Sequence, residues 1–548
     1  MKKILFFALI ILYNVSHSQT VDLKWSKPSL DKKKQVGYSD VVEGEGKYLY
    51  TTTISGEIGF TWRGRETESA YVSKSDNSII AYDRVTLDEV AKVTIVGKNS
   101  LLSEMSEFKD YLMARVFSTD EKIVVFLSES TFNDKEKVAV LELTPDLKPI
   151  GGPKVIHEVK SKKKYSLSST LVQRNARTGK YLLMNEEEGE QGNIKMMYVV
   201  YNLDYSKADL GEVNLPFVWD GNASANFRDY QWLGENFVIL NSDVKEHFPD
   251  APRKKQWVYY SVFTAVNLSQ GKASTYTLKN DELKYSGINL EINDDRASLL
   301  GFYSNTNEEG ENPVLNGFFS CSLNLNTGEF SDIATTEFDY DFYTNFKNHY
   351  PDKVKGNKTE IPYHYVNGMR IEKRLSLGNK TILICSIQNN EKIKYSNGNE
   401  LKHCVNRGVI SFVLNSEMKI EKYNIIPRVA RYDFLHNVDD MTVAQLSSDS
   451  YIIVYSSNAD LKEVNKEGKP EFLDSKVNDR ILYYAVMNRS GEMKEGKFIC
   501  DSNLLKTEKE FAFLPYQMKE SGGKLYIFGL YGSGNKEKEI AIGTFEIK

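Results

Sequence analysis

The sequence predicts an all-β protein, a single β-propeller of four-stranded antiparallel blades, with eight blades favoured over seven. Three observations support this fold class. Apolar runs end repeatedly in a turn-opening residue, several strand-like runs fill each interval between turns, and aromatic residues make up 12% of the chain. Aromatic rings suit half-buried strand faces, and a signal that returns along the chain is typical of a repeat architecture.

The recurring turn gives the period of the repeat. Thr, Asp, Ser and Asn begin turns because their side chains bond to backbone N–H groups ahead of them. Successive turns of this kind are separated by 58, 60, 65, 57, 89 and 73 residues. The turn-opening residues that we assign are Thr86, Thr144, Asp204, Ser269, Asn326, Asn415 and Asn488.

Each period holds four short runs, which we letter A to D in chain order. Run B is the most apolar, as in "KIVVFL" (122–127), and run D is polar, as in "KASTYTL" (272–278). Four such runs with tight turns predict a four-stranded antiparallel sheet. Packing these sheets face to face around an axis buries both faces of each, as in a propeller. Two stacked β-sandwich domains are the alternative.

The ends of the chain give the blade count. The last unit (511–548) supplies strands A, B and C, while the alternating run "TVDLKWSK" (20–27) belongs to no unit of its own. We therefore expect 20–27 to pair with the final C strand near 538–547 and to close a ring of eight blades. Seven blades is the alternative, if the atypical first unit (37–96) is not a blade.

One short motif carries a family resemblance. The run "GGKLYIFG" (522–529) resembles the double-glycine and strand signature of kelch repeats, which implies a propeller. It occurs once, and a tight A–B turn also explains Gly522-Gly523. The resemblance is therefore to β-propellers in general.

The N-terminus predicts export. Lys2 and Lys3 precede an apolar run of ten residues (4–13), and small residues stand before Gln19. This pattern is typical of a secretory signal peptide over 1–18, which leaves 19–548 as the propeller domain. No later run has the length of a membrane-spanning helix, so we expect a soluble periplasmic or extracellular protein.

Charge and motifs exclude several function classes. The net charge is −5, so no strong positive field collects phosphates, and we expect no nucleic-acid partner. The chain lacks a G-x-S-x-G elbow, an H-E-x-x-H helix and a Walker loop, and its seven His are scattered. We therefore expect no catalytic residues, no cofactor and no metal site.

The long connections all fall on one face of the predicted propeller. They are the B–C connections and one D–A connection (339–367), whereas the A–B and C–D turns are tight. Long loops on a rigid scaffold are where binding residues concentrate. In the alternative, long loops persist without a function, because lengthening a loop costs little stability. The long B–C connections are 242–256, 304–314, 388–403 and 456–478.

The connection 339–367 is rich in aromatic residues, unlike a disordered linker. We predict that it binds a partner, because Tyr offers an apolar body with a polar tip. In the alternative, its rings fold down as a plug over the central channel or pack on the fifth and sixth blades. The predicted partner-binding residues are Tyr340, Tyr343, His349, Tyr350, Tyr363 and His364.

Cys385 and Cys404 lie on neighbouring strands of one predicted blade. Adjacent antiparallel strands are close enough for a disulfide, which would staple the base of the connection between them. Cys321 and Cys500 fall in different blades and are expected to stay unpaired. Four buried free thiols are the alternative.

These observations favour an exported, non-enzymatic scaffold that binds an envelope or extracellular protein through its long-loop face. The alternative is a glycan-binding or glycan-cleaving enzyme with its site at the channel mouth. Two carboxylates about 5–10 Å apart in a cleft would mark such a glycosidase.

Overall fold

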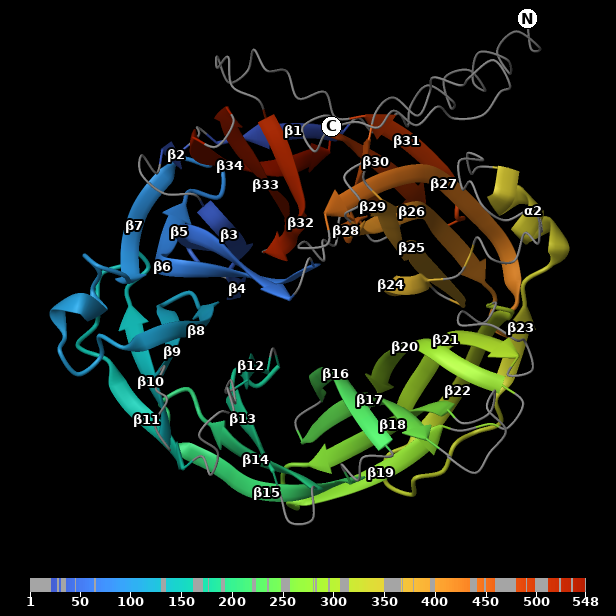
Figure 1. Ribbon diagram of the computed structural model, residues 1–548, viewed down its shortest axis with the longest axis horizontal. Coiled ribbons are helices and arrows are strands. Elements are labelled where there is room, and N and C mark those ends of the chain that lie inside the picture. The colour runs from blue at the N-terminus through green and yellow to red at the C-terminus, as the bar shows by residue number, and fades with distance from the viewer. Residues whose placement is uncertain are drawn as a thin grey trace, which may run out of the picture.

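In the computed structural model the chain forms eight β-sheets that stand around a common axis (Figure 1). Within the described residues, helix is confined to η1 (Leu102–Glu104) and α2 (Tyr340–Asn348). The structure describes residues 21–26, 29–30, 36–44, 46–63, 66–129, 135–160, 171–175, 177–188, 193–218, 223–233, 236–247, 257–278, 280, 283–293, 296–305, 315–348, 366, 368–377, 379–394, 400–433, 441–447, 450–458, 480–488, 490–497, 511–521, 524–533 and 536–547.

In seven sheets the four main strands stand in chain order, with the first nearest the axis and the last outermost (Figure 1). Antiparallel four-stranded sheets around an axis fit a β-propeller, and we number them in chain order. Sheets 1 to 4 comprise β3 (Val36–Val41), β5 (Leu49–Arg63), β6 (Glu66–Tyr82) and β7 (Glu89–Val96); β8 (Tyr111–Ser118), β9 (Ile123–Glu129), β10 (Lys135–Leu143) and β11 (Lys154–Lys160); β12 (Leu171–Arg174), β13 (Tyr181–Glu188), β14 (Asn193–Tyr201) and β15 (Lys207–Val218); and β16 (Ala223–Leu233), β17 (Phe237–His247), β18 (Trp257–Asn267) and β19 (Lys272–Leu278).

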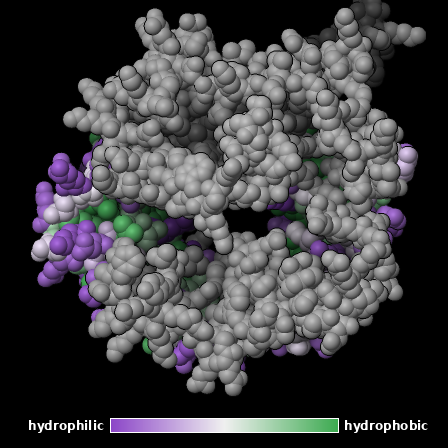
Figure 2. All heavy atoms as spheres, in the orientation of Figure 1, coloured by the Kyte–Doolittle hydropathy of each residue, from purple (hydrophilic) through white to green (hydrophobic). Residues whose placement is uncertain are grey.

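The next three sheets repeat this order. A further short strand, β4 (Glu43–Gly44), adds to the inner edge of sheet 2 and runs parallel to β8. Figure 2 shows an opening at the centre of the face seen along the axis. Sheets 5 to 7 comprise β20 (Leu283–Asn293), β21 (Arg296–Asn305), β22 (Gly317–Asn324) and β23 (Ala334–Glu337); β24 (Met369–Leu377), β25 (Lys380–Lys394), β26 (Glu400–Leu414) and β27 (Ile420–Asp433); and β28 (Met441–Ser447), β29 (Ser450–Asn458), β30 (Arg480–Asn488) and β31 (Met493–Lys497).

Sheet 8 brings the two ends of the chain together. It contains β32 (Phe511–Ser521), β33 (Lys524–Ser533) and β34 (Lys536–Ile547), and its outermost strand is β1 (Val21–Trp25). β1 pairs antiparallel with β34 from Val21↔Ile547 to Trp25↔Gly543, and β2 (Ser29–Leu30) pairs further along β34. The buried Ser26 continues the pairing, because Ser26 N donates to Ile542 O at 2.7 Å and Ile542 N donates to Ser26 Oγ at 2.9 Å.

The core lies between neighbouring sheets. The first five residues of β9 are all buried, as expected for a strand covered on both faces. One cluster joins sheet 1 to sheet 2 through Ile79 and Val125, and another joins sheet 5 to sheet 6 through Phe318 and Phe412. The apolar B and C runs of the sequence therefore provide the inter-sheet core.

The structure shortens several predicted long loops. The connection 388–403 is largely a hairpin, because β25 runs through Lys394 and β26 begins at Glu400. Similarly, β17 extends into 242–256 as far as His247, and β18 begins directly after this connection, at Trp257. In these connections the paired strands extend beyond the ends of the neighbouring strands. Part of each predicted loop is therefore regular β-structure.

The C–D turns recur as the sequence predicts, although three of their opening residues differ. Thr144, Asn415 and Asn488 accept backbone N–H groups of their own turns through side-chain oxygens. Asp204 also accepts, from Ser206 N at 3.0 Å. The turns assigned to Thr86, Ser269 and Asn326 begin two or three residues earlier, because Asp83, Asn267 and Asn324 accept from their first N–H groups. Thr86 also accepts within its turn, from Asp88 N at 3.2 Å.

Every one of the seven C–D turns contains a residue in the left-handed region, with φ between 61° and 77°. This conformation reverses the chain but costs a non-glycine residue about 1–2 kcal/mol. The seven residues are Leu87, Leu147, Tyr205, Gly271, Gly328, Met418 and Gly491.

The same turns connect each sheet to the sheet before it. For each of sheets 1 to 7, a hydrogen bond joins the C–D turn, or a strand end beside it, to the preceding sheet. Sheet 8 has no C–D turn, because its last two strands, β34 and β1, are not consecutive in the chain. Burying such polar groups without partners would cost about 1–3 kcal/mol each, so these bonds hold neighbouring sheets in register. They are Lys24 Nζ to Val85 O (2.6 Å), Tyr50 OH to Pro145 O (3.0 Å), Tyr205 OH to Glu142 Oε1 (2.6 Å), Tyr198 OH to Leu268 O (2.8 Å), Tyr276 OH to Leu325 O (2.9 Å), Thr336 Oγ1 to Met418 O (2.9 Å) and Asn424 Nδ2 to Gly491 O (3.0 Å).

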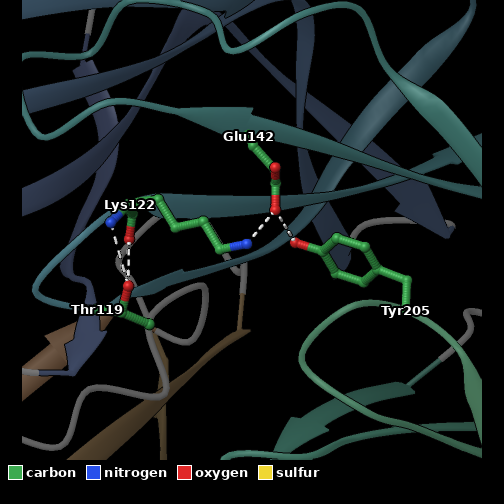
Figure 3. Close-up of polar contacts among 4 residues, drawn as sticks. All are labelled: Thr119, Lys122, Glu142 and Tyr205. Carbon is green, nitrogen blue, oxygen red and sulfur yellow. Dashed lines mark hydrogen bonds and ion pairs between the residues drawn. The ribbon is translucent and has the colours of Figure 1, made fainter.

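The junction between sheets 2 and 3 is the most polar of these contacts (Figure 3). Glu142 on β10 accepts from Tyr205 OH at 2.6 Å and forms an ion pair with Lys122, which belongs to the β8–β9 turn. The Tyr205 ring stacks on Tyr181, with centroids 6.2 Å apart. Burial alone would raise the pKa of Glu142, but the two hydrogen bonds outweigh it and the pKa lies below its ordinary value.

We expect Glu142→Gln to lower stability in a pH-dependent manner. The folded-state pKa of Glu142 is depressed, so its contribution is present above the unfolded pKa of about 4.3 and is lost as pH falls through the folded value. The variant should be less stable than the wild type by about 1 kcal/mol at pH 7. Urea unfolding at pH 7 and pH 3 measures this, and the difference should be smaller at pH 3.

Glu121→Gln, on the same β8–β9 turn but exposed, is the matched control and should change stability little at either pH. A deficit of Glu142→Gln that is the same at both pH values would contradict the ionic account of this junction.

Candidate binding groove

The predicted partner-binding connection begins with a helix. Asp339 precedes α2 and accepts from Phe342 N through Oδ1 at 2.7 Å, which satisfies a free donor of the first turn. Phe342, Tyr343 and Phe346 recur at helical spacing and are buried. They pack between sheets 5 and 6 with Phe318 and other buried residues. Figure 1 shows α2 at the outer edge of the ring beside β27.

The aromatic residues of this helix therefore follow the alternative reading, packing on the fifth and sixth blades rather than plugging the channel. Tyr343 is only 3% exposed, and its hydroxyl donates to Leu315 O at 2.7 Å. It is unavailable to a partner in this structure, because it serves the core. Tyr340, on the other face of the helix, is 63% exposed and remains a candidate contact. The other predicted contacts, His349, Tyr350, Tyr363 and His364, lie outside the described residues.

A groove of about 480 Å³ opens where α2 begins. One wall comes from sheet 5 and the start of the connection, and the other comes from the first residues of β27 in sheet 6. The rings of Phe342 and Tyr423 meet edge to face, with centroids 5.2 Å apart. The lining residues are Thr336, Glu337, Asp339 and Phe342 on the first wall and Lys419, Ile420, Glu421, Lys422 and Tyr423 on the second.

Hydrogen bonds fix both walls of the groove. Asn345 Nδ2 donates to Tyr423 OH at 2.7 Å, which ties α2 to β27. Thr336 Oγ1 donates to Met418 O at 2.9 Å, which ties β23 to the C–D turn of sheet 6. The groove is therefore preformed by two sheets and one helix, and its rim does not depend on a single loop.

The rim carries both signs of charge. Glu421 is paired with Lys380 at 2.7 Å, and Lys419 is paired with Glu417 at 2.8 Å. Lys419 lowers the pKa of Glu417 through a hydrogen bond and its charge. Glu337 on the first wall and Lys422 on the second add further exposed ionic groups. Apolar rings between ionic walls suit a peptide segment that inserts an apolar side chain and pairs its charges at the rim.

The sequence did not single out Lys422 or Tyr423. A usable signal exists, since "KIEKYNII" (419–426) follows a C–D turn and fits the polar D run, and D strands are outermost. The sequence does not indicate that this strand contacts α2. Asn345 and Tyr423 are 78 residues apart in the chain, and the packing of sheets 5 and 6 brings them together.

The predicted disulfide is wrong. Cys385 is a buried free thiol, and burial raises its pKa well above the ordinary value. The strands pair Cys385 with Ile410 and Cys404 with Asn390. Five to six rungs at about 3.3 Å per residue separate the two cysteines, far beyond disulfide reach. Cys321 is also a free thiol, as predicted, whereas Cys500 lies outside the described residues.

The described residues hold no cluster of three or more His, Cys, Asp or Glu side chains that could bind a metal. No helix in the same set of residues is long and apolar enough to cross a membrane. The predicted signal peptide (1–18) lies outside the part of the chain that the structure describes.

Comparison with known proteins adds little. No family model and no curated protein matches the chain, so the kelch-like run stays a resemblance. Among solved structures, the WD40 domain of SCAP from fission yeast aligns at 8% identity and a TM-score of 0.35, covering 96% of this chain and 98% of that one. The polysaccharide lyase Uly1 aligns at 8% and 0.36, covering 95% and 100%. A levansucrase mutant from B. megaterium aligns at 11% and 0.26, covering 57% and 91%. At these TM-scores the fold assignment rests on strand pairing alone.

Proposed function

We propose that this chain is an exported, non-enzymatic scaffold, a closed propeller of eight blades, that binds an envelope or extracellular protein. The observation that carries the proposal is the preformed groove between sheets 5 and 6. It lies at the start of the connection that the sequence marks as aromatic-rich, and Tyr340 stands exposed beside it.

The size of the groove indicates what it holds. A volume of about 480 Å³ accommodates a few side chains of a partner. A specific protein interface buries about 1,200–2,000 Å² in total. The remaining contact area therefore comes from the adjoining connections, and the groove acts as the anchoring pocket.

A double variant, Tyr340→Ala with Lys422→Glu, tests this function. Both side chains are exposed, so the fold should be retained, while the anchoring contact and one rim charge are lost. Affinity capture from the protein's own envelope extract identifies the partner. Its affinity for the purified variant should fall at least about tenfold, the equivalent of 1.4 kcal/mol.

The matched control is Leu210→Ala with Lys272→Glu, which alters an equally exposed apolar residue and an exposed lysine on β15 and β19. It should bind the partner as the wild type does. Equal loss in both variants would place the interface elsewhere. Recovery of a glycan and no protein would favour the enzyme or lectin alternative.

A further inference from the structure

Four of the innermost strands carry an excess of positive charge that the chain as a whole does not share. The full sequence has a net charge of −5. The described side chains of β8, β12, β20 and β24 nevertheless include six cations and only two acids, Glu291 and Glu372. The cations are Arg115, Arg174, Lys284, Arg370, Lys373 and Arg374.

Both acids already have partners. Glu291 pairs with Arg374 Nε at 3.2 Å, and this contact bridges sheets 5 and 6. Glu372 accepts from Ser386 Oγ on the neighbouring strand. Six cations less two carboxylates leave four positive charges on these four strands.

Three of the cations are exposed and come from opposite parts of the ring. Arg115 lies on β8 in sheet 2, and Arg370 and Lys373 lie on β24 in sheet 6 (Figure 1). The pairing of β8 with β9 shifts between Met113 and Arg115, and a similar shift precedes Lys373. Such bulges re-aim side chains at the rim of a closed sheet structure.

Uncharged polar groups accompany these cations. Gln173, Thr442 and Gln445 are half-buried or exposed on the inner strands β12 and β28. Asn289 follows a bulge in β20, and its buried Oδ1 has no hydrogen-bond partner within the described residues. Amide and hydroxyl groups of this kind bind hydroxyl-rich ligands.

The aromatic residues of these strands exclude a stacking platform. On β8, β12, β20, β24 and β28 the aromatic residues are Tyr111, Phe117 and Tyr285, and all three are buried, so these five strands offer no ring to stack a base. Single-stranded nucleic acids are bound by such rings together with positive charge. A ligand that suits this surface therefore carries anionic groups and hydroxyls without planar bases.

We propose that the inner-strand surface around the central opening binds an acidic oligosaccharide. The exposed Arg and Lys side chains would bind its carboxylate or sulfate groups, and the amides would bind its hydroxyls. Figure 2 shows hydrophilic side chains beside the central opening. This site is separate from the groove on the outer edge of sheets 5 and 6, so either can fail alone.

The test compares purified wild type with Arg370→Gln/Lys373→Gln by isothermal titration at low salt. The probes are an oligogalacturonate, a heparin-derived oligosaccharide and a neutral maltooligosaccharide. We expect the wild type to bind at least one acidic probe and not the neutral one. The variant should bind that acidic probe at least tenfold more weakly, with a smaller dependence of affinity on salt. Arg115→Gln, from the opposite sheet, gives a second reading if the double variant does not fold.

The matched control is Lys148→Gln/Lys272→Gln, which removes two exposed lysines from a C–D turn and an outer strand. It should bind as the wild type does. Three results would overturn the proposal: equal binding of the neutral probe, equal loss in the control, or tighter binding of single-stranded DNA than of either acidic probe.

Discussion

Removal of residues 19–30 is expected to lower the stability of the protein by several kcal/mol. The deletion strips β1 and β2 from β34, with five residue pairs in β1 alone. Backbone hydrogen bonds contribute about 1 kcal/mol each, and the exposed edge of β34 would also lose the buried contact of Ser26 with Ile542. Guanidinium unfolding of the mature and truncated proteins measures the effect.

This deletion acts on the sheet whose outer edge comes from the other end of the chain. Sheet 8 lacks the C–D turn found in each of the other seven sheets, and the N-terminal strands β1 and β2 supply its outer edge. Lys24→Gln is the control, since it removes only the side-chain bond to Val85 O and should cost less than 1 kcal/mol. A truncated protein as stable as the mature one would show that β1 does not close the ring.

The repeat was readable from the sequence because each period ends in the same chemistry. An Asp, Asn or Thr side chain accepts the N–H groups of every C–D turn, and that requirement leaves a mark at a regular interval. The opener was misplaced at Ser269 and Asn326 because polar residues fill these turns, and Asn267 and Asn324 stand at strand ends that look continuous with the apolar run.

The cysteine pairing failed for a different reason. Cys385 and Cys404 are on adjacent strands as expected, but register depends on where a hairpin turns. The polar run 388–403 has the composition of a loop, but its two halves are paired strands as far as Lys394 and Glu400. The resulting register places Cys404 away from Cys385. Polar composition alone does not separate a loop from a solvated hairpin.

The groove shows a similar limit. The first aromatic residues of 339–367 belong to α2, and the helical spacing of Phe342 and Phe346 explains which rings turn inward. The second wall of the groove comes from β27. The sequence around α2 does not indicate that β27 packs beside it. Contacts between consecutive sheets are therefore the part of the site that a single sequence leaves undetermined.

The left-handed turn position is filled in two complementary ways. In sheets 1, 2 and 6 the residue is Leu87, Leu147 or Met418, whose side chain packs into the junction with the preceding sheet. In sheets 5 and 7 it is Gly328 or Gly491, and a side chain of the preceding sheet takes the space. A Cβ on Gly328 would lie 2.6 Å from Tyr276 Cε1.

We therefore expect Gly328→Ala to cost about 3 kcal/mol, from left-handed strain of about 1 kcal/mol and overpacking against Tyr276 of about 2 kcal/mol. Gly151→Ala is the matched control, because Gly151 has φ 76° and nothing within 4 Å of an added Cβ. It should show the strain alone. In a Tyr276→Ala background, Gly328→Ala should likewise cost only about 1 kcal/mol. Urea unfolding of the four proteins of this cycle measures the coupling. Equal costs for Gly328→Ala and Gly151→Ala, or strict additivity with Tyr276→Ala, would mean that the ring of Tyr276 does not fill this turn.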